Sequence, residues 1–212
     1  MANSIHTEIL LLIQQLQPGE IIFPSDFLHL GSVAGVNMAL SRLARTGILQ
    51  RLAQGIYVYP KKDPLIGPVR PSLEEIASAI AQKEHVRIRP TGATALNKLG
   101  WSTQVPMRVS YLTDGNPRTI KVGKGTLTFK KSTPKIMSVK GSTNFLVIQA
   151  LQTLGKDAAT DTKFLLDIYQ LLKSEDVTTL RQDAKLAPAW IAQVLYKIAN
   201  QIEQDGNMAP AS

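Results

Sequence analysis

The chain has 212 residues, and its 24 Lys and Arg against 16 Asp and Glu give a formal charge of +8. It contains no cysteine, which excludes disulfide scaffolds, thiolate zinc sites, iron–sulfur clusters and cysteine nucleophiles. No apolar run approaches the roughly 20 residues that span a bilayer, and the N-terminus lacks a basic start before an apolar stretch, so we expect a cytoplasmic protein that does not bind membranes.

Residues 1–47 predict three helices. Apolar side chains repeat at helical spacing over residues 5–16, and a helix-start signal at Phe23–Asp26 opens a short second helix through Phe27 and Leu28 that Gly31 ends. Ser32 is placed to cap a third helix, which Gly47 ends. The side chains expected on the buried face of this helix are Val33, Val36, Leu40, Leu43 and Ala44.

Two short strands are predicted after the third helix. They cover residues 48–51 and 56–59, and Gln54 and Gly55 supply the turn between them. Three helices followed by a hairpin, with a glycine-containing turn between the second and third helices, are the layout of a winged helix-turn-helix. The third helix of such a domain enters the DNA major groove, so we assign residues 1–60 to a DNA-binding domain.

The next segment, residues 61–71, is rich in proline and is expected to form an extended linker. A second domain, residues 72–205, then begins with a capping-box helix at Ser72 and Glu75. It continues with a strand, a short helix and three strands joined by tight turns, over residues 86–89, 91–99, 107–112, 118–122 and 126–130.

Helices are expected from residue 141 to residue 205, and residues 206–212 are expected to form a flexible tail. The predicted fold class is therefore α+β. It consists of an N-terminal winged helix-turn-helix, followed by an α+β domain with a small antiparallel sheet and C-terminal helices.

The positive charge is regional. Residues 73–150 hold twelve basic and four acidic side chains, a net charge of +8. The segments before and after it carry only +2 and −2. A local basic field favours a polyanionic partner, most often nucleic acid, and a solvated lysine-rich surface is the alternative.

The residue patterns of common enzyme sites are missing. The three histidines, His6, His29 and His85, are scattered, and the sequence has no zinc-protease helix, nucleophile elbow or phosphate loop. Gly-Ser pairs at residues 31–32 and 141–142 lack the two following aspartates of a nucleotidyltransferase. We therefore expect no enzyme activity, no cofactor and no metal site. The alternative is a nucleic-acid-processing enzyme whose site is assembled from distant residues.

Polar and basic side chains of the third helix lie off its expected buried face. Arg can donate two hydrogen bonds to guanine and Asn can pair with adenine, while Ser and Arg also hold phosphates. The winged-helix layout favours DNA over a merely solvated face. The DNA-binding candidates on this helix are Ser32, Asn37, Met38, Ser41, Arg42 and Arg45, and those on the wing are Arg51, Gln54, Tyr57, Lys61 and Lys62. For Tyr57 and Tyr59 the alternative is packing across the hairpin.

The sheet of the second domain is predicted to carry a basic face. Strand alternation places Ile120, Val122, Leu127 and Phe129 on one face and Thr119, Lys121, Thr128 and Lys130 on the other. We expect the second face to bind phosphate or an acidic protein. The residues assigned to the basic surface are Arg87, Arg89, Lys121, Lys124, Lys130, Lys131, Lys135 and Lys140.

Several short segments together resemble the AbiEi-type antitoxins. Their order and spacing over residues 5–155 carry the likeness, since each segment is weak alone. In the N-terminal part they are Phe23–Phe27, Ala39–Gly47 and Gly55–Pro60. In the following part they are Pro64–Pro68, Pro90–Ala93, Leu99–Pro106 and Tyr111–Gly115.

The resemblance implies an antitoxin of a bacterial type IV toxin–antitoxin or abortive-infection system. Its functional partner would be a nucleotidyltransferase-like toxin, neutralised through the second domain without a stable complex. The resemblance also implies that the winged helix binds double-stranded operator DNA with inverted repeats and represses the protein's own operon. Two other interpretations stay open: a module that binds and inhibits a toxin directly, and a stand-alone DNA-binding transcriptional regulator.

Overall fold

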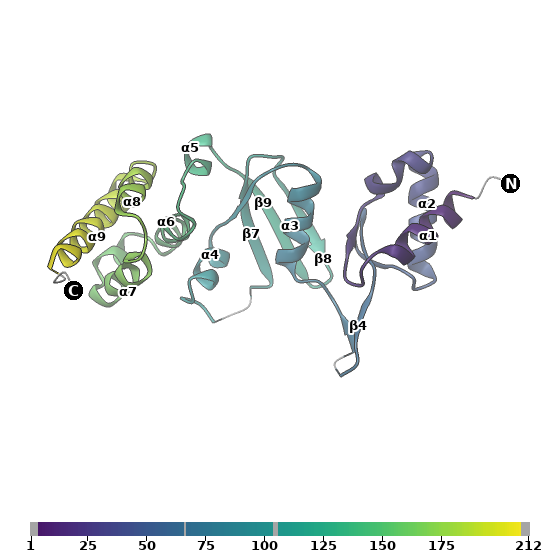
Figure 1. Cartoon of the computed structure of the whole chain (residues 1–212), viewed down its shortest axis with the longest axis horizontal. Coiled ribbons are helices and arrows are strands. Elements are labelled where there is room, and N and C mark those ends of the chain that lie inside the picture. Colours follow the sequence, from purple (N-terminus) through teal and green to yellow (C-terminus); the bar gives the residue numbers. More distant parts are fainter. Residues whose placement is uncertain (1–3, 66, 104–105, 209–212) are drawn as a thin grey trace. The chain divides into compact units, whose positions relative to one another are not determined.

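The computed structural model describes residues 4–65, 67–103 and 106–208 (Figure 1). The chain divides into two compact units, Met1–Glu84 with Ile120–Leu127, and His85–Thr119 with Thr128–Ser212. The expected α+β class is confirmed, because helices accompany small antiparallel sheets and the C-terminal part is helical. The proline-rich segment expected as a linker lies inside the first unit.

The first unit begins with the three predicted helices, which are α1 (Ile5–Gln15), the 3₁₀ helix η1 (Pro24–Leu30) and α2 (Val33–Arg45). The side chain of Ser4 accepts a hydrogen bond from the Thr7 amide, and that of Ser32 accepts one from the Gly35 amide. These hydroxyls satisfy amides that have no partner within their own helix. The buried side chains packed between the helices include Ile9, Ile13, Phe27, Val36, Leu40 and Leu43.

Two details of these helices differ from the prediction. The second helix is a 3₁₀ helix of seven residues between Phe23 and Gly31, which is longer than most runs of this type. Val33, expected on the buried face of α2, is 59% exposed. A helical side chain covers the turn that precedes it, and the first residue of α2 has no such turn. Ala39 completes the buried face instead.

A three-stranded sheet follows, in the order β1–β3–β2, from β1 (Ile21–Ile22), β2 (Gln50–Ala53) and β3 (Ile56–Val58). Both pairings are antiparallel. The β2–β3 hairpin was predicted, and its turn uses Gly55 at φ +69°, a conformation that favours glycine. Strand β1 was not predicted, because two residues are too few to show an alternating pattern.

In the segment expected as an extended linker, β4 (Lys61–Asp63) pairs antiparallel with β5 (Gly67–Val69) to form a two-stranded ribbon. Pro68 is tolerated there because a two-stranded ribbon leaves outward-facing amides unpaired. The predicted capping box then opens α3 (Leu73–Lys83). The Ser72 amide donates to Glu75 Oε2 at 2.7 Å, and the Glu75 amide donates to Ser72 Oγ at 3.1 Å.

A four-stranded sheet has the order β6–β7–β9–β8. Its strands are β6 (Ile88–Pro90), β7 (Arg108–Thr113), β8 (Arg118–Val122) and β9 (Gly125–Lys131), and α4 (Ala93–Lys98) lies between β6 and β7 in sequence. The tip of the β8–β9 hairpin, residues 120–127, is grouped with the first unit. The predicted alternation is confirmed, since Leu127 and Phe129 are buried while Thr119, Lys121 and Lys130 are exposed.

The remaining elements are helical: α5 (Pro134–Met137), α6 (Ser142–Leu154), η2 (Lys156–Thr160), α7 (Thr162–Leu172), α8 (Val177–Ala184) and α9 (Ala189–Met208). Figure 1 shows α8 and α9 side by side. The core that α6, α7, α8 and α9 share includes Phe145, Ile148, Leu151, Ile168, Leu180 and Leu195. Helix α9 extends into the expected tail as far as Met208, and residues 209–212 lie outside the described residues.

Candidate nucleic-acid interface

Helix α2 presents one polar face to solvent. The six residues assigned to DNA on this helix, from its N-cap to its last turn, are all exposed. Asn37, Ser41 and Arg45 recur every four residues and so share a face, while Val36, Leu40 and Leu43 are fully buried on the other side. The amphipathic pattern thus orients the helix by burying one side of it.

Both ends of α2 are fixed by local hydrogen bonds. Ser32 caps the first turn, as described above. At the other end Thr46 Oγ1 donates to the carbonyl oxygens of Arg42 and Leu43 at 3.3 and 3.1 Å. Gly47 then reverses the chain at φ +79°. The last turn, which carries Arg42 and Arg45, is therefore held in place.

Arg42 and Arg45 line an open cavity of about 520 Å³ together with Ser4, His6 and Thr46. Sequence reasoning identified the two arginines and missed the other three residues. Ser4 and His6 lie off the apolar stripe of α1, which marks them as surface residues. Nothing in the sequence indicates that they meet the last turn of α2, since that contact joins residues about 40 positions apart.

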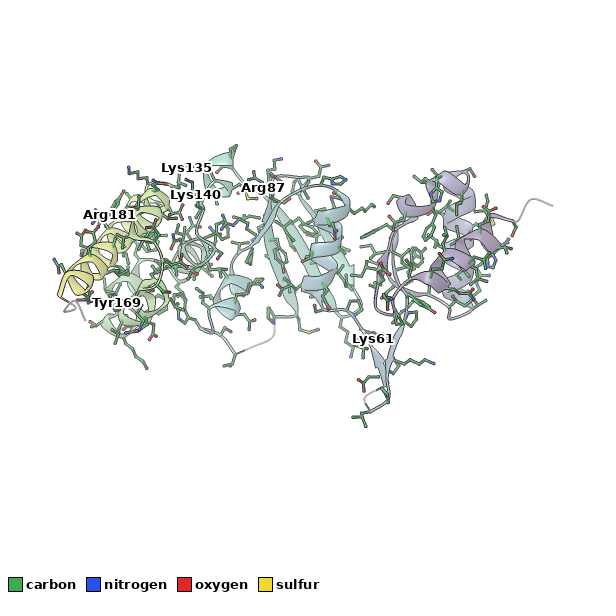
Figure 2. All side chains as sticks on the ribbon, in the orientation of Figure 1. Lys61, Arg87, Lys135, Lys140, Tyr169 and Arg181 are labelled. Atoms are coloured by element: carbon green, nitrogen blue, oxygen red, sulfur yellow. The ribbon has the colours of Figure 1, made fainter. Side chains whose placement is uncertain are left out.

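The wing candidates divide into exposed residues and one buried ring. Arg51, Gln54, Lys61 and Lys62 are exposed, and Lys61 is labelled in Figure 2. Arg51 Nε donates to the Ala53 carbonyl at 3.4 Å within its own strand. Tyr57 corrects the prediction, because it is 3% exposed and belongs to the core of the first unit. Its ring packs in that apolar core and is not open to DNA.

All six lysines assigned to the basic surface of the second domain are exposed. They are Lys121, Lys124, Lys130, Lys131, Lys135 and Lys140. Figure 2 labels Lys135, Lys140 and Arg87 along the upper edge of the second unit in that view. Lys140 Nζ donates to Gln182 Oε1 at 3.4 Å. The hydroxyl oxygens of Thr119 and Thr128 lie 3.4 Å apart, as expected for neighbours on one face of the β8–β9 hairpin.

Arg87 and Lys131 are engaged at the turn that follows β7. Arg87 Nε donates to Asp114 Oδ2 at 2.8 Å, and this bond lowers the pKa of Asp114. Lys131 Nζ donates to the carbonyl oxygens of Asp114 and Gly115 at 2.8 and 3.2 Å. Both cations are exposed, yet each has a structural role that the basic-surface assignment did not foresee.

Arg89 is the second correction. Its guanidinium carbon lies 3.6 Å from the centre of the Phe145 ring, and the group donates to the carbonyl oxygens of Val139 and Gly141. The side chain is half-buried, and this burial lowers its pKa from the usual arginine value. Arg89 therefore tethers the segment before α6 and does not belong to a phosphate-binding surface.

Asp183 is a buried residue that sequence reasoning missed. Its carboxylate accepts hydrogen bonds from the amides of Lys140 and Gly141 and from Asn144 Nδ2, all at 2.8 Å. The sequence does carry one sign of its burial: Asp183 lies three positions after Leu180, which places an acidic residue on the buried face of α8. The Gly141-Ser142 turn considered for nucleotidyl transfer is thus a segment fastened by Asp183.

Within the described ranges, no three His, Asp or Glu side chains gather in a way that could hold a metal ion. No helix among the described residues is both long and apolar enough to cross a membrane.

A groove of about 370 Å³ between α7 and α9 is lined partly by Leu165, Leu166 and Val194. Beside it the Tyr169 hydroxyl, labelled in Figure 2, donates to Asp205, which raises the pKa of Tyr169.

Comparison with known proteins gives a matching family model and similar solved structures. A family model described as "Family of unknown function (DUF6088)" matches residues 8–180. No curated protein matches the sequence. Among solved structures, the chain is similar to the RV2827C protein from Mycobacterium tuberculosis, at 12% identity and a TM-score of 0.46, over 93% of this chain and 82% of that chain.

Proposed function

Since the chain belongs to DUF6088, a family of unknown function, no activity comes to it from its family, and we propose from its own residues that it binds double-stranded DNA. In this proposal the first unit contains a winged helix-turn-helix, α2 is the recognition helix, and the protein represses transcription. The observation that carries the proposal is the exposed polar face of α2, opposite a fully buried apolar face.

The order of elements supports this assignment. Helix, strand, helix, helix and a two-strand wing follow one another from α1 to β3, and the sheet order β1–β3–β2 places β3 in the middle. The turn between η1 and α2 contains Gly31 and Ser32, as a helix-turn-helix requires. A recognition helix needs side chains that reach base edges, and Asn37 and Ser41 project from α2 without another described role.

We extend the proposal to an antitoxin of the type IV or abortive-infection class, on the strength of the resemblance to AbiEi-type antitoxins. The partner of such a protein is a nucleotidyltransferase-like toxin. The operator would contain inverted repeats upstream of the protein's own gene. The protein would neutralise the toxin through its second unit, without forming a stable complex.

The test is a double substitution on the exposed face of α2. Asn37→Ala with Ser41→Ala should weaken binding to the duplex upstream of the protein's own gene, because one lost bidentate pair costs about 1–3 kcal/mol of discrimination. Binding to a scrambled duplex of equal length should be unchanged. Gel-shift titrations of both duplexes with the full-length protein measure the two affinities.

The matched control is Ser78→Ala with Gln82→Ala, which has the same spacing on the exposed side of α3 in the same unit. It should bind both duplexes like the wild type. Equal affinity of the α2 variant and the wild type for the upstream duplex would remove α2 from DNA recognition. If the antitoxin extension holds, the α2 variant still rescues cells from the toxin, because neutralisation is assigned to the second unit.

A further inference from the structure

The cavity beside the last turn of α2 brings together donors from two elements distant in sequence. Ser4 and His6 come from the start of α1, and Arg42, Arg45 and Thr46 come from the end of α2. The five lining residues comprise two guanidinium groups, two hydroxyls and one imidazole, and they include no carboxylate. The two guanidinium groups make the cavity positively charged, whereas the Thr46 hydroxyl already donates to the carbonyl oxygens of Arg42 and Leu43.

This donor set matches a tetrahedral oxyanion. A guanidinium group offers a planar fork of N–H donors that fits the oxygens of a phosphate, and the Ser4 hydroxyl and the His6 imidazole can complete the coordination. A flat base edge would use one arginine, directed outward along the groove, with no contribution from α1. The convergence of two arginines with α1 residues around one cavity favours a single phosphate over two separate guanine contacts.

We propose that this cavity is an oxyanion site that binds one phosphate group, held jointly by Arg42 and Arg45 with Ser4 and His6, while Thr46 lines the cavity and fixes the last turn of α2. The phosphate comes from a DNA backbone or from a free phosphate ion. The DNA source rests on the proposed function of the first unit, whereas the phosphate-binding chemistry does not. The assignment gives the two arginines a positioning role on DNA, in place of the base reading expected from the sequence.

The first experiment uses inorganic phosphate as the probe, at constant ionic strength, with calorimetric titration of the full-length protein. Arg42→Gln with Arg45→Gln should weaken phosphate binding by about tenfold or more, since charge-assisted hydrogen bonds are removed. The variant with Lys at both positions keeps the charge and the fold but loses the forked geometry, so its affinity should be intermediate. Lys173→Gln with Lys185→Gln removes equal charge from exposed sites elsewhere and should change nothing.

The second experiment measures how DNA affinity depends on salt, for the upstream and scrambled duplexes. One phosphate contact contributes about 0.9 to the log–log salt slope. The double Gln variant should therefore lower the slope by about 0.9 and weaken both duplexes by the same factor. A fall of about 1.8 would mean two separate phosphates and would overturn the shared site. An unchanged slope with lost preference for the upstream duplex would show that the arginines read bases, and would also overturn it.

The two experiments keep this inference distinguishable from the proposed function. Phosphate binding that depends on Arg42 and Arg45, in a protein that binds neither duplex, would uphold the oxyanion site and refute DNA binding. If the double Gln variant binds DNA as the wild type does and the wild type binds no phosphate, the oxyanion site is refuted and DNA binding is upheld. Failure in both experiments would refute both proposals.

Discussion

Asp183 and Arg89 fasten the same short segment from two sides. Asp183 accepts three hydrogen bonds from residues 140–144, and Arg89 donates to the carbonyl oxygens of Val139 and Gly141. Asp183 also favours the charged form of Arg89 through its negative charge. A buried carboxylate is tolerated only when donors and an opposite charge compensate for its lost hydration. These two residues therefore hold the start of α6 in place.

Asp183→Asn should destabilise the second unit by about 2–4 kcal/mol. The asparagine side chain accepts hydrogen bonds only through its oxygen, and its NH₂ group would face one of the N–H donors that Asp183 now binds. Both tryptophans, Trp101 and Trp190, pack against the core of this unit, so tryptophan fluorescence during urea unfolding measures its stability. Asp167→Asn, on the exposed side of α7, is the control and should be neutral. A destabilisation below about 0.5 kcal/mol for Asp183→Asn would refute the fastening role.

Several helices begin at a short side chain that caps their first turn. Ser4, Ser32 and Ser72 each accept a bond from an amide in the first turn, and Asp161 and Asp176 do the same for α7 and α8. At α3 the cap is reciprocal, and the bond from the Ser72 amide to Glu75 is the main reason that the pKa of Glu75 is lowered. A lowered pKa in the folded state means that ionised Glu75 stabilises the fold.

The stabilisation by Glu75 should depend on pH in a defined direction. It is fully present above the unfolded-state pKa and is lost as pH falls through the lowered folded-state value. Glu75→Gln should therefore weaken the first turn of α3 by about 0.5–1 kcal/mol at pH 7, and the difference from wild type should shrink as pH falls below 4.5, the ordinary pKa of a glutamate. Hydrogen exchange of the α3 amides measures this difference.

The control for this measurement is Glu74→Gln, which removes a charge from the same turn and leaves the bonds between Ser72 and Glu75 in place. It should show a smaller difference from wild type. A pH-independent effect of Glu75→Gln would indicate that the carboxylate does not cap the helix.

The whole molecule combines two units with an uneven charge. The basic excess of residues 73–150 is partly consumed by structure, since Arg89 is half-buried and Arg87 and Lys131 bind Asp114. Three exposed lysines of the β8–β9 hairpin, Lys121, Lys124 and Lys130, belong to the part that stays available to a partner. A nucleic acid and an acidic protein would respond differently to their removal.

Replacing these three lysines with Gln should lower the salt slope of DNA binding by about 0.9 for each phosphate that the variant no longer binds. Upstream and scrambled duplexes should weaken alike, because phosphate contacts do not read sequence. The matched control replaces three exposed lysines of the C-terminal helical part with Gln and should leave the slope unchanged. These lysines are Lys156, Lys163 and Lys173. An unchanged slope in the hairpin variant, with failure to rescue cells from the toxin, would instead assign this surface to an acidic protein.

The features that depend on neighbouring residues could be predicted from the amino-acid sequence alone. Helical spacing located α1, α2, α3 and α9, serine caps marked the starts of α2 and α3, and strand alternation assigned the two faces of the β8–β9 hairpin. Periodicity and capping act within a few residues of the chain, so they can be read along it. The same local patterns identified most of the exposed face of α2.

The contacts that join distant segments became visible only in the folded chain. Packing buried Tyr57, drew Arg89 onto Phe145, placed Asp183 beneath residues 140–144 and brought His6 to Arg42 and Arg45. Each of these results depends on which elements pack together, and a polar residue looks the same in sequence whether a partner covers it or water does. Burial and long-range pairing are properties of the packed chain, and so the candidate site was complete only once the fold was known.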